Sequence, residues 1–136
     1  MTLKSSEVSV GDTHTERVVE DLKRTQIVMY AGASGDYNPV HTDEIFTTKV
    51  AGYPSVFAHG MLTMGLTGRM LTNFVGDGRL TEFGVRFTSQ VFPGDTLDAT
   101  ATVVGLENGC VELSVSTVNQ NGVEVAKGSA KARVDD

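Results

Sequence analysis

Hairpin signals in the last third of the chain are the strongest constraint on the fold. Residues 80–134 are rich in Val and Thr and are interrupted by Pro93-Gly94-Asp95, Asn108-Gly109 and Asn121-Gly122. An Asn-Gly pair is typical of a tight β-turn, because both residues tolerate positive φ angles. Residues 80–134 therefore predict four antiparallel strands that follow one another as a meander.

The alternation of side chains in this region predicts a sheet with one apolar face. Val111, Leu113 and Val115 alternate with polar residues, so they share one side of their strand. Residues 60–75 are the natural cover, since they form a helical stretch that is apolar on nearly every side and has a single charge, Arg69. We expect the sheet to wrap around this buried helix.

Two glycines inside the expected helix indicate close packing. Gly65 and Gly68 each cost about 1 kcal/mol relative to Ala in a helix. Their presence predicts that another backbone approaches the helix at these positions.

The first third predicts a shorter helix and then a long loop. Residues 22–34 have helical spacing of apolar residues and are followed by Gly35, a typical helix end. Residues 35–59 contain two prolines and little periodicity, and they predict a loop with one short helix after Thr42, capped by the Thr42 hydroxyl. Because long ordered loops tend to be functional, we expect the chemistry here.

Size and charge exclude several classes of protein. The 136 residues predict one domain, and a net charge of −6 disfavours nucleic acid and membrane surfaces as partners. The single cysteine, Cys110, cannot form an internal disulfide, and no zinc-ligand spacing is present. No secretory leader or membrane-spanning stretch is visible in the sequence, so we expect a cytoplasmic protein.

Three polar residues in the loop form a candidate site. Asp36, Asn38 and His41 fall within six residues, with Pro39 restricting the backbone between them. Near pH 7 an ionised aspartate and a neutral histidine can together bind and activate a water molecule. The alternative is structural: Asp36 caps a turn, Asn38 forms an Asx-turn and His41 binds loop carbonyls. The residues alone leave both interpretations open.

A second candidate site lies where the loop enters the long helix, at Ala58-His59-Gly60. A helix N-terminus offers unpaired N–H donors and positive partial charge, and glycine allows a ligand oxygen to come close. This start therefore predicts an oxyanion site, with an ordinary helix start as the alternative.

These motifs resemble one known family. Residues 31–65 contain G-D-x-N-P-x-H, an acidic pair and A-H-G-M-L, and closely resemble the hydratase motif of the MaoC-like family. That family includes (R)-specific enoyl-CoA hydratases and (3R)-hydroxyacyl dehydratases. Residues 81–97 resemble the family's strand and P-G-D turn, so the likeness spans most of the chain.

The resemblance implies an α+β fold of the hot-dog type over residues 1–136, in which an antiparallel β-sheet wraps a long central α-helix. It implies that Asp36 and His41 are catalytic and that the Gly60 amide forms the oxyanion hole, with Asn38 in support. Four further residues are candidates for the acyl pocket: Tyr53, Val56, Phe57 and Met61. The alternative is that the first three pack the loop onto the long helix and that Met61 belongs to the core.

The implied activity is that of a lyase of fatty-acid metabolism. It adds water to a trans-2-enoyl thioester to give the (3R)-3-hydroxyacyl thioester, or catalyses the reverse, without a metal or redox cofactor. Two alternatives remain: a non-catalytic acyl-binding subunit of a heteromeric dehydratase, and a hot-dog thioesterase.

The implied partners are acyl-CoA or acyl carrier protein thioesters and a second subunit. Four basic strand residues either meet the phosphates of coenzyme A or a carrier protein, or stay solvated: Arg86, Lys127, Lys131 and Arg133. Exposed sheet edges predict a homodimer, or a heterodimer with a related subunit.

Overall fold

One antiparallel sheet and one long helix dominate the computed structural model, which describes residues 2–136. Five strands pair in the order β1-β3-β4-β5-β2. They are β1 (Thr13–Val19), β2 (Leu80–Phe87), β3 (Leu97–Glu107), β4 (Cys110–Val118) and β5 (Glu124–Arg133). The α-helices are α1 (Arg24–Ser34) and α2 (Gly60–Val75). Three short helices complete the fold: η1 (Ser5–Glu7), η2 (Pro39–His41) and η3 (Phe46–Val50). Within residues 2–136, no helix is long and apolar enough to cross a membrane.

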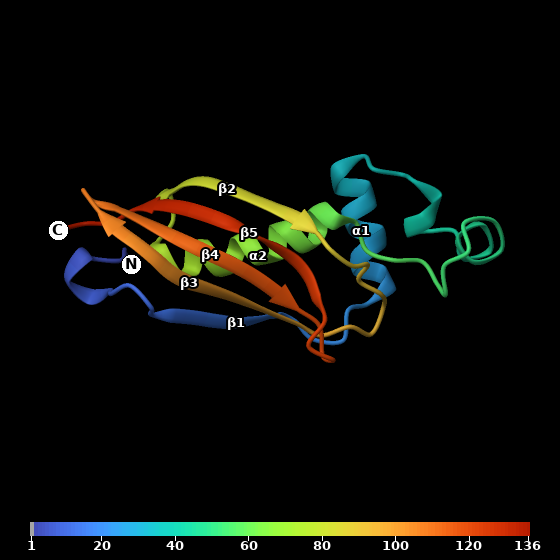
Figure 1. Cartoon of the computed structure of the whole chain (residues 1–136). Coiled ribbons are helices and arrows are strands. Elements are labelled where there is room, and N and C mark those ends of the chain that lie inside the picture. Colours follow the sequence, from blue (N-terminus) through green and yellow to red (C-terminus); the bar gives the residue numbers. More distant parts are fainter. Residues whose placement is uncertain (1) are drawn as a thin grey trace.

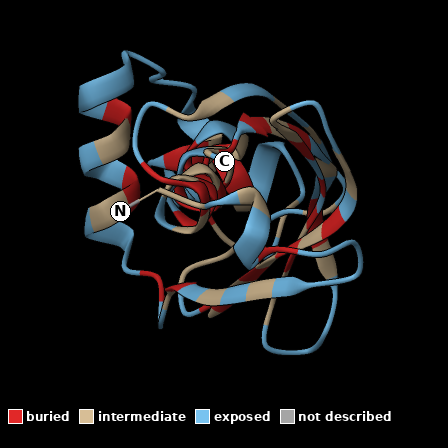
Figure 2. Cartoon of the chain, turned by 90° about the vertical axis from the view of Figure 1, so that its left-hand side faces the viewer, coloured by how far each residue is buried: buried red, intermediate tan, exposed pale blue. Residues whose placement is uncertain are grey.

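The sheet curves around α2, as the sequence predicts (Figures 1 and 2). Met70, Leu71 and Val75 of α2 are fully buried. The apolar face of β4 is buried as well, and Figure 2 shows the buried residues gathered between the helix and the sheet. The α+β class and the arrangement of a sheet around a central helix are therefore confirmed.

The expected four-stranded meander is wrong for its first strand. Strands β3, β4 and β5 do follow one another, but β2 pairs with β5 at the far edge. The connection between β2 and β3 cannot be a hairpin, because it crosses the open end of the sheet and is tied there to the start of α1. Gly94 N–H donates to the Leu22 carbonyl at 2.8 Å, and Leu22 N–H donates to the Asp95 carbonyl at 2.9 Å.

The two Asn-Gly turns differ in geometry. Asn108 and Gly109 both have positive φ, 53° and 72°, as a tight hairpin between β3 and β4 requires. At the second turn only Gly122 has a positive φ, 75°. Both turns nevertheless join neighbouring antiparallel strands, as predicted.

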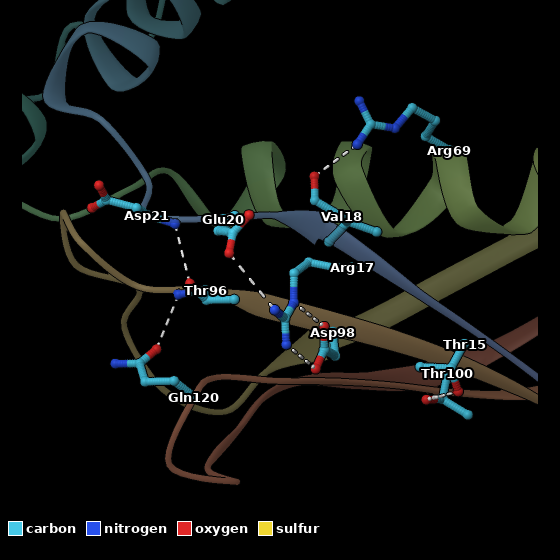
Figure 3. A network of polar contacts seen from close by, with 10 residues as sticks. All are labelled: Thr15, Arg17, Val18, Glu20, Asp21, Arg69, Thr96, Asp98, Thr100 and Gln120. Carbon is cyan, nitrogen blue, oxygen red and sulfur yellow. Dashed lines mark hydrogen bonds and ion pairs between the residues drawn. The ribbon is translucent and has the colours of Figure 1, made fainter.

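A fifth strand, β1, was not expected from the sequence. Its residues are mostly polar, and polar cross-strand contacts hold it against β3 (Figure 3). Arg17 Nε donates to Asp98 Oδ1 at 3.0 Å, and the Thr15 and Thr100 hydroxyls lie 2.8 Å apart. Arg69, the only charge on α2, donates from Nη2 to the Val18 carbonyl at 2.7 Å and so ties the helix to this edge.

The expectation that α2 is buried on every side is wrong for one face of the helix. Met61, Gly65, Arg69 and Asn73 are exposed, because the sheet covers only one side of the helix. No backbone approaches the two helix glycines: nothing lies within 4 Å of a Cβ placed at Gly65, and at Gly68 the nearest atom belongs to the Phe83 ring, at 3.3 Å. The close-backbone interpretation of these glycines is therefore wrong.

The helix before the loop is confirmed, and the short helix within the loop is shifted. α1 ends at Gly35, whose φ of 75° is left-handed. The short helix is η3, and its start is capped by Asp43, whose Oδ1 accepts from Phe46 N–H at 3.0 Å, rather than by Thr42. Thr42 instead ends η2, where its backbone N–H donates to the Pro39 carbonyl at 3.2 Å.

The closest backbone approach in the sheet lies at Gly128, and it generates a stability prediction. A Cβ at Gly128 would collide with the Gly84 carbonyl group of β2, whereas a Cβ at Gly84 has nothing within 4 Å. We expect Gly128→Ala to lower the free energy of unfolding by about 1–3 kcal/mol, the usual cost of overpacking, and Gly84→Ala to cost less than about 1 kcal/mol. Urea unfolding measures both, and equal stabilities would contradict this account of the strand contact.

Candidate active site

The candidate residues meet at the open end of the sheet. α1 and the loop of residues 35–59 lie beside the N-terminus of α2, beyond the ends of the strands (Figure 1). Asp36 and His41 come from this loop, and Gly60 is the first residue of α2. The fold therefore brings both candidate sites of the sequence into one place.

Asp36 and His41 face each other. Asp36 Oδ2 lies 3.8 Å from His41 Nε2, and the other carboxylate oxygen, Oδ1, accepts from the Asn38 N–H at 3.2 Å. His41 Nδ1 lies 2.7 Å from the Phe57 carbonyl oxygen. Because a carbonyl can only accept, Nδ1 carries the proton and the lone pair of Nε2 is turned toward Asp36. A separation of 3.8 Å is too long for a direct hydrogen bond, so one water can contact both groups.

His41 is held in its neutral form. Its side chain is buried, and this burial lowers the pKa of His41 below its ordinary value of about 6.5. The neighbouring His59 ring lowers the pKa further, and the Phe57 carbonyl and the Asp36 carboxylate oppose the shift only in part. An uncharged imidazole beside a solvent-accessible carboxylate can accept a proton from a bound water near pH 7.

Asn38 shapes the turn between the two groups. Its Oδ1 accepts from Val40 N–H at 3.2 Å and so caps η2, as the Asx-turn interpretation requires. Its own N–H holds the Asp36 carboxylate. The structural interpretation of Asn38 therefore holds, and its functional role stays a prediction.

Gly60 places a free amide at the start of a helix of 16 residues. Within residues 2–136 the Gly60 N–H has no hydrogen-bond partner, as expected for the first turn of a helix. A Cβ at this position would come within 2.7 Å of the Phe87 ring. A side chain here would therefore have to displace the Phe87 ring, and the unpaired N–H can donate to an anionic oxygen.

A cavity of about 240 Å³ opens beside Gly60. Its apolar wall includes Phe57, Phe87 and Val125, and its polar wall is formed by Thr63 and residues 88–90. Sequence analysis did not single out this wall, because Thr63 lies within an apolar helix and residues 88–90 entered only as part of the resemblance over residues 81–97.

Of the four expected pocket residues, only Phe57 lines this cavity. Val56 is buried, and the Tyr53 ring packs edge-on against Phe57 with ring centroids 4.7 Å apart. Met61 is 55% exposed. For Tyr53 and Val56 the structure thus matches the alternative, in which they pack the loop.

Two of the four basic residues are already paired. Lys131 Nζ lies 3.6 Å from Glu112 and 3.9 Å from Glu82, and Arg133 donates to the Gly78 carbonyl at 2.8 Å. Arg86 and Lys127 are exposed and lie opposite each other on β2 and β5. Of the four basic residues, only Arg86 and Lys127 therefore remain available for an anionic ligand.

The sequence interpretation missed the position of His59. Its side chain makes no hydrogen bond to the helix that it precedes, and instead its ring stacks on His41 with ring centroids 3.7 Å apart. Ligand atoms of Asp36, His41 and His59 all lie within 4.8 Å of one another, and in residues 2–136 they are the one group that could hold a metal ion. Chain spacing did not reveal this cluster, since His59 is 18 residues away from His41.

The sequence is similar to members of one protein family. The chain matches the family model described as "MaoC like domain" over residues 5–125. It is 38% identical to 3-hydroxyacyl-thioester dehydratase Y of Mycobacterium tuberculosis over 63% of this chain and 31% of that protein. It is 37% identical to the peroxisomal enoyl-CoA hydratase 2 of Arabidopsis thaliana over 64% of this chain and 28% of that protein. The chain thus spans less than a third of the length of these curated relatives.

A solved structure shows the same fold over nearly the whole chain. The unliganded R-hydratase PhaJ1 from Pseudomonas aeruginosa superposes with a TM-score of 0.88 at 26% identity, over 99% of this chain and 87% of that chain. The expected hot-dog fold is confirmed by this similarity together with the wrapped helix.

The environment of His41 generates a prediction about its titration. We expect ¹⁵N NMR to show a His41 pKa below about 6.5 and a proton on Nδ1 in the neutral form, because burial disfavours the charged ring. Since the unfolded chain then binds the proton more tightly, the free energy of unfolding should fall as the pH drops below about 6.5. The spectrum of His41→Ala assigns the signal, and a His41 pKa above that of an unfolded peptide would contradict the expectation.

Proposed function

We propose, because the chain belongs to the MaoC-like domain family, that it is a hydro-lyase acting on a thioester. In this proposal it adds water to a trans-2-enoyl thioester to form the (3R)-3-hydroxyacyl thioester, or catalyses the reverse dehydration. The observation that carries the proposal is the pairing of the Asp36 carboxylate with the neutral His41 Nε2, 3.8 Å apart, beside the unpaired amide of Gly60.

Asp36 and His41 bind the reacting water in the proposed mechanism. The lone pair of His41 Nε2 and the ionised carboxylate both accept hydrogen bonds from it, which raises the nucleophilicity of its oxygen. The oxygen bonds to the β-carbon of the enoyl group, and the proton released is taken up at the Asp36–His41 pair. A proton then passes from this pair to the α-carbon, so that the elements of water are added across the double bond.

Gly60 stabilises the charge that develops during this attack. As the water oxygen bonds to the β-carbon, electron density moves to the thioester oxygen. The resulting enolate oxygen accepts a hydrogen bond from the Gly60 N–H. The α2 dipole adds positive partial charge at the same point. No step requires a metal or redox cofactor, so activity should survive treatment with a chelator.

The cavity beside Gly60 is the place that we propose for the acyl group, because it opens next to the amide that receives the thioester oxygen. Phe57, Phe87 and Val125 give it an apolar wall, which suits an acyl chain. We propose coenzyme A or an acyl carrier protein as the thiol carrier.

One assay separates this activity from the two alternatives. With crotonyl-CoA, a hydratase removes the absorbance of the conjugated enoyl thioester without releasing thiol, whereas a thioesterase releases free coenzyme A. A non-catalytic acyl-binding subunit does neither. The neutral histidine beside an ionised carboxylate favours the hydratase, since a purely structural subunit needs no such pair.

Substitution of the water-binding pair tests the mechanism. Asp36→Asn and His41→Ala should each lower kcat for crotonyl-CoA hydration by at least about 100-fold, because each removes an acid–base group. Circular dichroism should be unchanged, and the remote substitutions His14→Asn and Asp136→Asn serve as controls with full activity. Near-normal turnover in both active-site variants would show that another pair of residues carries the reaction.

We also propose a dimer formed through β2. Within residues 2–136 this strand pairs only with β5, which leaves its other edge without a partner strand, and an exposed edge favours pairing with a second strand. Phe87 at the end of β2 is 49% exposed and packs on Gly60, and the next residue of α2, Met61, is exposed as well. A partner on this edge covers apolar surface and lies next to the active site. A second copy of this chain or a related subunit can fill that place.

Analytical ultracentrifugation at micromolar concentration tests the dimer. The purified chain alone should sediment at twice its monomer mass of 14.5 kDa if the partner is a second copy. Glu82→Pro removes a backbone N–H from β2 and should shift the chain toward monomer. A wild-type monomer with full hydratase activity would exclude the homodimer.

A further inference from the structure

His59 is packed between two aromatic rings in the interior of the site. Its side chain is 1% exposed. One face of the ring stacks on His41, with centroids 3.7 Å apart and an interplanar angle of 22°. The Tyr30 ring of α1 packs against it at 4.8 Å and 61°. His59 therefore fixes where the His41 ring lies relative to α1.

The same side chain also holds the backbone of Asp36. His59 Nε2 lies 3.0 Å from the Asp36 carbonyl oxygen, and because that oxygen can only accept, Nε2 carries the proton. One imidazole thus contacts both members of the water-binding pair. It directly precedes Gly60, so it also connects them to the N-terminus of α2.

The other nitrogen of His59 argues against a simple packing role. Nδ1 is the only buried side-chain nitrogen or oxygen within residues 2–136 that has no hydrogen-bond partner. Leaving a polar atom unpaired in the interior costs free energy, which phenylalanine would avoid at this position. A histidine retained at this cost indicates that the Nε2 hydrogen bond or the imidazole ring itself is needed.

We propose that His59 is a positioning residue, which sets the geometry between the Asp36 carboxylate and His41 Nε2 through its hydrogen bond to the Asp36 carbonyl and its stacking on His41. The activity readout of this inference rests on the proposed function. His59 touches no reacting atom in the proposal. Its effect is exerted entirely through the two groups that bind the water.

His59 also acts on the charge state of its neighbour. The two imidazole rings are stacked, and the His59 ring lowers the pKa of His41. The titratable groups that face His59 are Tyr30 from α1, and Asp36 and His41 from the loop. Removal of the second imidazole should therefore shift the titration of His41 upward.

Two substitutions at the same position test the proposal. His59→Phe keeps an aromatic ring against His41 and loses the hydrogen bond, whereas His59→Gln keeps an amide that can donate to the Asp36 carbonyl. We expect His59→Phe to lower kcat by about 10- to 100-fold with little change in KM, since misplacement of catalytic groups has effects of this size. His59→Gln should recover part of that loss. His14→Phe, a matched change in β1, should have wild-type kinetics.

The pH profile separates positioning from a purely structural role. In His59→Phe the acid limb of kcat/KM should move to higher pH, because the His41 pKa rises. A wild-type kcat together with an unchanged acid limb of the kcat/KM profile would overturn the proposal. A lower melting temperature without a shift of that acid limb would overturn it as well, since it would show a purely structural role. If His59→Phe does not fold, the acid limb of kcat/KM and the kcat of His59→Gln test the proposal by the same criteria.

A structural measurement keeps this inference independent of the proposed function. Crystal structures of wild type and of His59→Phe require no turnover. A changed distance between Asp36 Oδ2 and His41 Nε2, which is 3.8 Å with His59 in place, supports the positioning role even if crotonyl-CoA is not hydrated, in which case the proposed function alone fails. The same distance in wild type and variant overturns the inference while leaving the hydratase assay to stand by itself.

Discussion

Burial of one face of α2 against the curved sheet is the constraint on which the rest of the structure depends. Met70, Leu71 and Val75 are fully buried beneath strands whose own apolar residues point inward. This packing fixes the axis of the helix, and so it fixes where Gly60 and its unpaired amide lie at the open end of the sheet. A helix N-terminus can stabilise negative charge only where a ligand can reach it, and Gly60 lines a cavity beside Phe87 of β2.

The loop of residues 35–59 is held in place by short polar contacts as well as by ring packing. His41 donates to the Phe57 carbonyl, His59 donates to the Asp36 carbonyl, and Glu44 pairs with Arg24 of α1 at 2.6 Å. The first two bonds also select the tautomers of the two histidines. The hydrogen bonds that position the two rings therefore also set their protonation, because the carbonyl that accepts from each ring decides which nitrogen keeps a lone pair.

The shared end of the sheet also links the site to the expected subunit contact. Phe87 ends β2 and lies against Gly60, so this edge strand and the Gly60 amide are neighbours. Both residues line the same cavity, so a subunit on this edge, as proposed, would lie next to it. The positions that remain exposed on α2, among them Met61 and Gly65, lie on the side of the helix that the sheet leaves open.

The sequence by itself determined the helix of residues 60–75, the hairpins at Asn108-Gly109 and Asn121-Gly122, and the candidate trio Asp36, His41 and Gly60, because periodicity, turn chemistry and a dense motif are local signals. Only the tertiary structure decided that β2 pairs with β5, that polar β1 joins the sheet, and that Gly65 faces open space. It alone placed His59 against His41 and Asp36. Such relations join residues far apart in the chain, and they depend on which faces the curved sheet covers, which no local pattern encodes.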